Sequence, residues 1–172
     1  MRRPYLFALV VLAGLALDQA SKAFAFGELP DEGVPLWEDV LHLKPALNRG
    51  VAFSLFADWP LAVLLVTAAA IGALWWWYLH GRAKARRVVL CAQALLLTGA
   101  TGNFIDRLRF AGVRDFFDFR PELPLIGHWA IFNVADVCIT VGVGLFVLAE
   151  FTRPEEASAD PAPQAEPVKS EQ

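Results

Sequence analysis

Long apolar runs recur four times along the chain, and segments rich in polar and charged residues separate them. The runs cover Tyr5 to about Phe24, Leu61 to Leu79, about Val88 to Phe104, and Trp129 to about Leu148. About 20 consecutive apolar residues are enough for a helix to cross the hydrocarbon core of a bilayer. The pattern therefore predicts an all-α membrane protein with four transmembrane helices.

The first run follows Arg2 and Arg3, as the apolar core of a cleaved leader peptide would. However, the run is long, and Asp18 and Lys22 occupy the region where a leader would be cut. We therefore interpret this run as a retained helix. The loop between the second and third runs, HGRAKARR, is short and basic. Together with Arg2 and Arg3, it indicates that both termini lie on the cytoplasmic side.

Two segments, residues 26–60 and 105–128, then form outer loops on the extracytoplasmic side. In the first of them, an NRG turn precedes the alternating apolar residues Val51, Phe53 and Leu55. Alternation of this kind after a turn is typical of a β-strand. The sequence thus predicts a small extracytoplasmic β-strand segment from the first outer loop.

Composition agrees with a membrane protein, because 56% of the residues are hydrophobic, against about 45–50% in ordinary soluble domains. The formal net charge is −3, and residues 152–172 account for all of it with five acidic and two basic side chains. This segment also holds four prolines, so we expect a disordered acidic cytoplasmic tail after a single membrane domain over residues 1–151. The chain has no basic stripe that would indicate a nucleic-acid partner. Cys91 and Cys138 lie in apolar runs without CxxC spacing, which favours two small buried thiols and no metal site.

Polar residues inside or beside the spans gather at one depth. The first span ends on the side of the membrane where the fourth begins, so residues near these two ends share a face. The residues concerned are Asp18, Lys22, Asn48, Asn103, Asp106, Arg107, Asp115, Asn133 and Asp136. Asn103 and Asp106 share a helix face at i,i+3 spacing, and Asp18 and Lys22 have the i,i+4 spacing of an ion pair. The convergence predicts one polar site near the extracytoplasmic surface.

Asp136 is the most informative of these residues, because it lies roughly 10 Å into its span at 1.5 Å per residue and has no basic neighbour there. A carboxylate at such a depth is costly and usually functional. The second outer loop offers Asp115 or Asp118, in GVRDFFDF, as a partner. Two carboxylates in a poorly hydrated pocket tend to share one proton. Such a pair suits peptide hydrolysis, because one member activates a water and the other protonates the leaving amine.

Other mechanisms find little support. The chain has no GxSxG or HExxH motif, and its three histidines, His42, His80 and His128, lie in loops. An ion-coupled transporter using Asp18, Asp106 and Asp136 is one alternative, although the polar groups stop at one depth instead of crossing the membrane. A non-catalytic membrane scaffold is another, but it would have no need for Asp136.

Five short blocks occur in order along the chain. They are DQASK (18–22), NRGVAFS (48–54), GNFIDR (102–107), VRDF (113–116) and FNVAD (132–136). With these blocks placed against four spans, residues 5 to about 150 resemble the lipoprotein signal peptidases, or signal peptidase II family, of bacterial membrane aspartyl proteases.

The resemblance implies that the catalytic pair is Asp115 and Asp136 and that Asp118 is not part of it. It implies that Asn133 orients the second aspartate or the substrate backbone. Asn48 and Gly50 would lie on an extracytoplasmic strand segment that partly covers the site. Asp18 would brace the site, and Lys22 and Ala135 complete the supporting set.

The same resemblance places Asn103 and Arg107 against the substrate, with Asp106 holding Arg107 in position. Arg114 stands where a small apolar residue is common in the family. There it would either perturb the neighbouring carboxylate of Asp115 or point to water.

The implied substrate is a bacterial prolipoprotein that carries a diacylglyceryl group on its lipobox cysteine, with cleavage just before that cysteine. No metal or organic cofactor is required, and the other partners are membrane lipids. Nothing in the sequence demands more than a monomer. The implied location is the bacterial cytoplasmic (inner) membrane, as a multi-pass protein whose site lies near the extracytoplasmic face.

Overall fold

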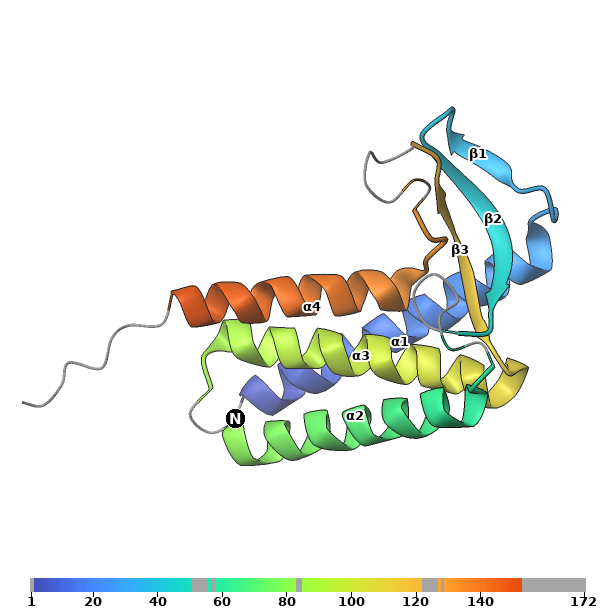
Figure 1. The fold of residues 1–172 in the computed structure, drawn as a ribbon. Coiled ribbons are helices and arrows are strands. Elements are labelled where there is room, and N and C mark those ends of the chain that lie inside the picture. The colour runs from blue at the N-terminus through green and yellow to red at the C-terminus, as the bar shows by residue number, and fades with distance from the viewer. Residues whose placement is uncertain are drawn as a thin grey trace, which may run out of the picture.

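Four long apolar helices and three short strands form the part of the chain that the structure describes. The computed structural model describes residues 2–50, 56, 58–82, 85–121, 127 and 129–152. The elements are α1 (Arg2–Glu28), β1 (Val34–Trp37), β2 (Leu41–Asn48), α2 (Pro60–Gly81), α3 (Arg87–Phe110), β3 (Val113–Phe119) and α4 (Val134–Phe151), shown in Figure 1. Each of the four helices is long and apolar enough to cross a membrane. The predicted fold class is therefore confirmed.

Two helix ends differ most from the predicted spans. Helix α3 continues to Phe110 instead of stopping near Phe104, so the first residues of the predicted second outer loop are helical. It ends where Ala111 adopts a left-handed conformation, with φ of 52°. Helix α4 begins at Val134 and not at Trp129, because Asn133 caps its first turn. Apolar run length alone could not locate these ends, since both are decided by backbone capping.

The three strands form one antiparallel sheet in the order β1-β2-β3, at the end of the helix bundle opposite the N-terminus (Figure 1). Strand β3 comes from the second outer segment, so the sheet is larger than the single segment predicted from the first. The register pairs Ala46 with Asp115 and Asn48 with Val113. A bulge between Leu43 and Ala46 surrounds Pro45, which has no N–H to donate to the neighbouring strand. The strand predicted at Val51, Phe53 and Leu55 lies outside the described residues.

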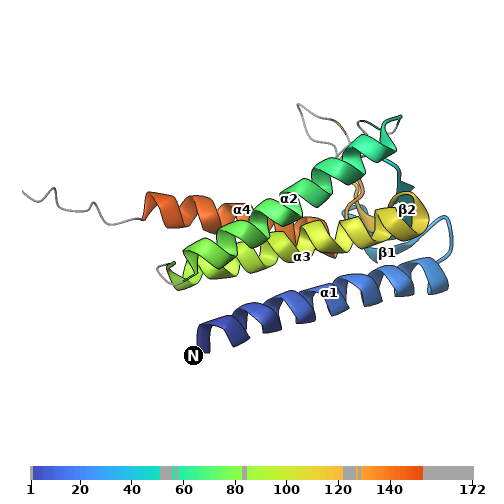
Figure 2. The same cartoon turned by 90° about the horizontal axis from the view of Figure 1, so that it is seen from below.

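Helix α3 is the central helix and packs against α1, α2 and α4 (Figure 2). Its approach to α4 is close because glycines face the neighbouring backbone. A side chain at Gly99 would collide with the carbonyl oxygen of Ala135, and one at Gly142 would lie 2.9 Å from Leu96. Small residues at helix contacts allow this kind of packing in membranes. The close contact fixes the start of α4, where Asp136 lies, against the last turns of α3.

Candidate active site

Most of the buried polar side chains lie where the sheet meets the ends of α1 and α3 and the start of α4. Among the described residues, the buried polar and charged side chains are Asp18, Lys22, Gln93, Thr98, Asn103, Asp106, Arg114, Asp115, Asp118 and Asn133. All except Gln93 and Thr98 belong to the sheet end of the molecule. Hydrogen bonds connect every residue that the sequence placed in the site, from Asp18 through to Arg107.

Asp115 lies in strand β3 and is only 2% exposed. The amide of Asn133 donates a hydrogen bond of 2.6 Å to its Oδ1, and the amide of Asn48 donates one of 3.1 Å to its Oδ2. Burial and the negative charge of Asp136 raise the pKa of Asp115 from 3.8 to about 7. This carboxyl group can therefore hold a proton at neutral pH, as one member of a shared pair must.

Asp136 lies in the first turn of α4, where the helix cap holds it. The Asn133 side chain accepts the backbone N–H of Asp136 at 3.1 Å, and the Asp136 carboxylate accepts the N–H of Asn133 at 3.0 Å. This reciprocal arrangement is a capping box. Asn103 donates a further hydrogen bond of 2.8 Å to the other carboxylate oxygen. Asn133 thus binds both carboxyl groups, with its amide on Asp115 and its backbone N–H on Asp136.

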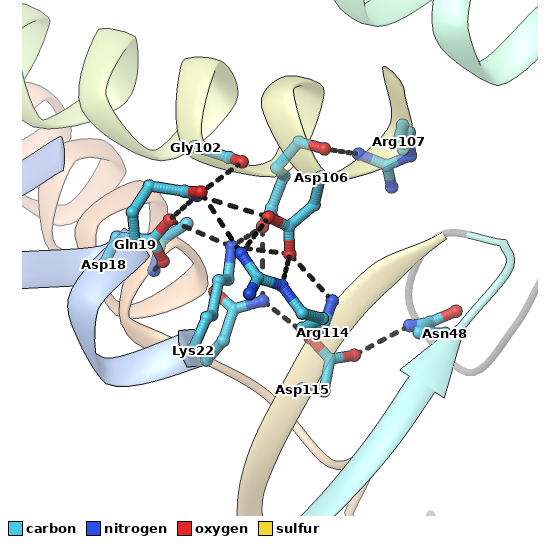
Figure 3. A network of polar contacts seen from close by, with 12 residues as sticks. Asp18, Gln19, Lys22, Asn48, Gly102, Asp106, Arg107, Arg114 and Asp115 are labelled. Carbon is cyan, nitrogen blue, oxygen red and sulfur yellow. Dashed lines mark hydrogen bonds and ion pairs between the residues drawn. The ribbon is translucent and has the colours of Figure 1, made fainter. Parts of the chain in front are cut away.

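A buried ionic network lies beside Asp115 (Figure 3). Lys22 Nζ lies 2.9 Å from Asp18 Oδ2, and it donates a hydrogen bond of 3.0 Å to Asn103 Oδ1. The second oxygen of Asp18 accepts the backbone N–H of Ala135 at 3.0 Å. The ion pair between Asp18 and Lys22 therefore fixes two things at once: the orientation of the Asn103 amide and the start of α4.

Asp106 does not hold Arg107, so the pairing implied by the family resemblance is wrong. Both oxygens of Asp106 instead accept hydrogen bonds from Arg114, at 2.8 and 3.1 Å. Arg107 donates to the carbonyl oxygens of Gly50 at 3.0 Å and Asn103 at 3.4 Å. Successive residues of an α-helix point about 100° apart, so Asp106 faces the network while Arg107 faces the site.

Arg114 does not point to water, which was one of its two expected orientations. Its side chain is buried against Asp106, and its guanidinium carbon lies 4.3 Å above the centre of the Phe110 ring. Gln19, the second residue of DQASK, was not among the predicted site residues, although its Oε1 accepts a hydrogen bond of 3.2 Å from Arg114. An uncharged polar residue beside Asp18 within a membrane span was the available signal.

Asp118 lies on the other face of strand β3 from Asp115, because side chains alternate along a strand. Its carboxylate pairs with Arg120 Nε at 2.8 Å. The geometry therefore separates Asp118 from Asp136. Asn103 was expected to face the substrate; it borders the cavity described next, but its amide is also engaged with Asp136 and Lys22. Cys91 and Cys138 are partly exposed, so the expectation of two buried thiols is wrong.

A cavity of about 790 Å³ opens between α2, α3, α4 and the sheet. Its polar end is formed by Asn48, Asn103, Arg107, Asp115 and Asp136. Its walls are mainly apolar and include Val66, Ala70, Ile131, Ile139 and Val141. Apolar walls with a few convergent polar groups are typical of a ligand site. Within the described ranges, no group of three His, Cys, Asp or Glu side chains is placed to hold a metal ion.

Four membrane-length helices, a small sheet at one end of the bundle and two carboxyl groups joined by one asparagine define the chain as a polytopic membrane enzyme. A solved bacterial membrane enzyme, determined by the in meso method at 1.9 Å resolution, has the same fold. It superposes with a TM-score of 0.74 at 25% sequence identity and covers 86% of this chain and 93% of that one.

Residues 10–152 match the family model for signal peptidase (SPase) II, and the chain belongs to this family of proteases. The lipoprotein signal peptidase of Synechocystis sp. is 36% identical over 151 residues, covering 85% of this chain and 88% of that protein. The lipoprotein signal peptidase of Streptococcus pneumoniae is 35% identical over 151 residues, covering 87% and 94%.

Proposed function

We propose that this protein is an aspartic endopeptidase that removes the signal peptide from diacylglyceryl-modified bacterial prolipoproteins, with Asp115 and Asp136 as the catalytic pair. One observation supports this above all others. Asn133 binds both carboxyl groups at the polar end of the cavity. The family relationship supports the substrate class, because the related proteins are lipoprotein signal peptidases.

In the proposed mechanism the pair starts with one proton between its two carboxyl groups. The ionised carboxylate takes a proton from a water molecule, whose oxygen attacks the scissile carbonyl carbon, while the protonated carboxyl donates to the carbonyl oxygen. The C–N bond then breaks as a carboxyl proton passes to the leaving amine. The hydroxyl proton of the intermediate returns to the pair, so the starting protonation state is restored.

The cavity supports a substrate that is anchored in the membrane. Part of its apolar wall, including Val66, Ala70 and Ile139, comes from membrane-spanning helices, so acyl chains can reach it from the lipid while the peptide lies at the polar end. The guanidinium group of Arg107 lies at this end and donates a hydrogen bond to the carbonyl oxygen of Gly50. Asn48 lies at the end of strand β2 and donates a hydrogen bond to Asp115, so the sheet forms one side of the site.

We further propose that the protein resides in the bacterial cytoplasmic (inner) membrane, with both termini in the cytoplasm. The basic loop that contains Arg82, Arg86 and Arg87 lies at the end of the bundle opposite the sheet (Figure 1). Basic loops favour the cytoplasmic side. The site then faces the extracytoplasmic surface, where the cleavage site of a lipid-anchored precursor would lie.

The proposed function is tested with the full chain purified in detergent micelles. One prolipoprotein is supplied in two matched forms, with and without the diacylglyceryl group on its lipobox cysteine, and the products are identified by mass spectrometry. We expect cleavage of the lipidated form immediately before the modified cysteine. Absence of cleavage, or equal cleavage of both forms, would contradict the proposal.

A further inference from the structure

Arg114 connects strand β3, which carries Asp115, to helix α3 (Figure 3). Its Nη2 and Nε donate to the two oxygens of Asp106 at 2.8 and 3.1 Å, and its own backbone N–H donates to Oδ2 at 2.9 Å. A third side-chain contact, 3.2 Å long, reaches Oε1 of Gln19 on α1. Three hydrogen bonds from one residue to one buried carboxylate hold the start of β3 rigidly on α3.

The position of this contact in the chain gives it a consequence for the site. Side chains alternate along β3, so Arg114 points to the ionic network while Asp115, the next residue, points to Asn133 and Asn48. Only two residues separate the last residue of α3 from the first residue of β3. A shift of Arg114 relative to Asp106 would therefore be passed directly to the Asp115 carboxyl.

The charges of the network lead to the same conclusion. Asp18 and Asp106 carry two negative charges, and Lys22 and Arg114 carry two positive charges. Lys22 lies 3.5 Å from Asp106 Oδ2 but donates at 3.0 Å to Asn103, which in turn donates to Asp136. Without Arg114, Lys22 alone would have to balance both carboxylates, and it would be drawn from Asn103 toward Asp106. Arg114 thus leaves Lys22 free to orient the amide that holds Asp136.

We propose that Arg114 is a positioning residue that sets the Asp115 carboxyl against Asp136 by clamping β3 to Asp106 of α3. This inference rests on the proposed function, because it concerns the geometry of the proposed catalytic pair. Arg114 does not border the substrate cavity. Its loss should therefore lower kcat and leave KM little changed.

The test compares Arg114→Leu and Arg114→Lys with Arg120→Leu as the matched control. Arg120 follows the same strand and forms an ion pair of 2.8 Å with Asp118, but this pair lies at the far end of β3 and outside the site. Kinetics of the full chain are measured with the lipidated prolipoprotein, and thermal unfolding is followed in the same micelles. We expect Arg114→Leu to lose about 100-fold in kcat, as a displacement of about 1 Å in an active site does. Arg114→Lys should recover part of this loss, and Arg120→Leu should match the wild type.

The possible failures are distinguishable. If the wild type and Arg120→Leu are both inactive, the proposed function fails and the inference falls with it. If both are active and Arg114→Leu has the wild-type kcat, or loses only in KM, the inference alone is overturned. If Arg114→Leu does not fold, Arg114→Lys decides, because lysine keeps the charge but cannot span both oxygens of Asp106. A folded Arg114→Lys with the wild-type kcat would overturn the inference, and a reduced kcat at unchanged thermal stability would support it.

Discussion

Asn133 combines two roles that a pair of substitutions can separate. Its Oδ1 caps helix α4 by accepting the N–H of Asp136 at 3.1 Å, and its amide nitrogen donates to Asp115 at 2.6 Å. Serine is as good an N-cap as asparagine, but its side chain is too short to reach Asp115. Asn133→Ser should therefore keep the cap and lose the bond to Asp115, whereas Asn133→Ala should lose both.

The expected magnitudes follow from these contacts. A hydrogen bond to a charged group contributes about 1.5–3 kcal/mol, which corresponds to a loss of roughly 10- to 150-fold if it is expressed in the rate. We expect Asn133→Ser to lose this much in kcat. Asn133→Ala should show a similar loss and unfold with about 1 kcal/mol less stability than Asn133→Ser, because it also lacks the cap.

The assay measures kcat at saturating concentrations of the diacylglyceryl-modified prolipoprotein. Thermal unfolding is measured in the same detergent. The Asn133 bond lowers the pKa of Asp115, so its loss should also raise that pKa further above about 7. An Asn133→Ser variant with the wild-type kcat would refute the role of the amide. Equal stability of the serine and alanine variants would refute the role of the cap.

Three further predictions concern pH, packing and buried charge. The pKa of Asp115 rises from 3.8 to about 7 on folding, so between these pH values the folded state binds more protons than the unfolded state. The free energy of unfolding, measured over a pH series, should therefore fall as the pH rises from about 4 to about 7. A free energy of unfolding that increases over this interval would contradict the prediction. Gly99→Ala should lower the free energy of unfolding by about 1–3 kcal/mol, because the added carbon meets the Ala135 carbonyl. Gly144→Ala is the control, since a side chain there would meet open space. Equal effects of the two substitutions on thermal unfolding would contradict this packing. Lys22→Met should cost about 3–5 kcal/mol in the free energy of unfolding, because it leaves the buried Asp18 carboxylate without its cation. Unchanged unfolding would show that the network contributes little.

The sequence predicted the four spans and the gathering of polar residues at one end because both depend on simple geometry. Run length determines whether a helix can cross the membrane, and successive spans alternate in direction. Asp18 in the first span and Asp136 in the fourth therefore had to lie on the same side. In the structure these two spans are joined directly, because Asp18 accepts the backbone N–H of Ala135, next to Asp136.

The contacts within the network could not be predicted in the same way. Asp106 is adjacent to Arg107 in the sequence, yet it binds Arg114 across the turn between α3 and β3. Sequence adjacency on a helix separates side chains, and only the fold shows which distant group fills the space. The extent of β2 was also not predicted, because Pro45 interrupts its alternation and the bulge that accommodates this proline has no clear sequence signal.

The central claim is that Asp115 and Asp136 together carry out the cleavage, and the most direct measurement is the kcat of three isosteric variants. Asp115→Asn, Asp136→Asn and Asp118→Asn would be compared with the wild type on the lipidated prolipoprotein, after each is shown to unfold at a temperature close to that of the wild type. We expect the first two to release no signal peptide above background. Asp118→Asn should retain nearly full activity, because its carboxylate lies on the opposite face of β3 and pairs with Arg120. Cleavage by Asp115→Asn, or its loss in Asp118→Asn, would contradict the account.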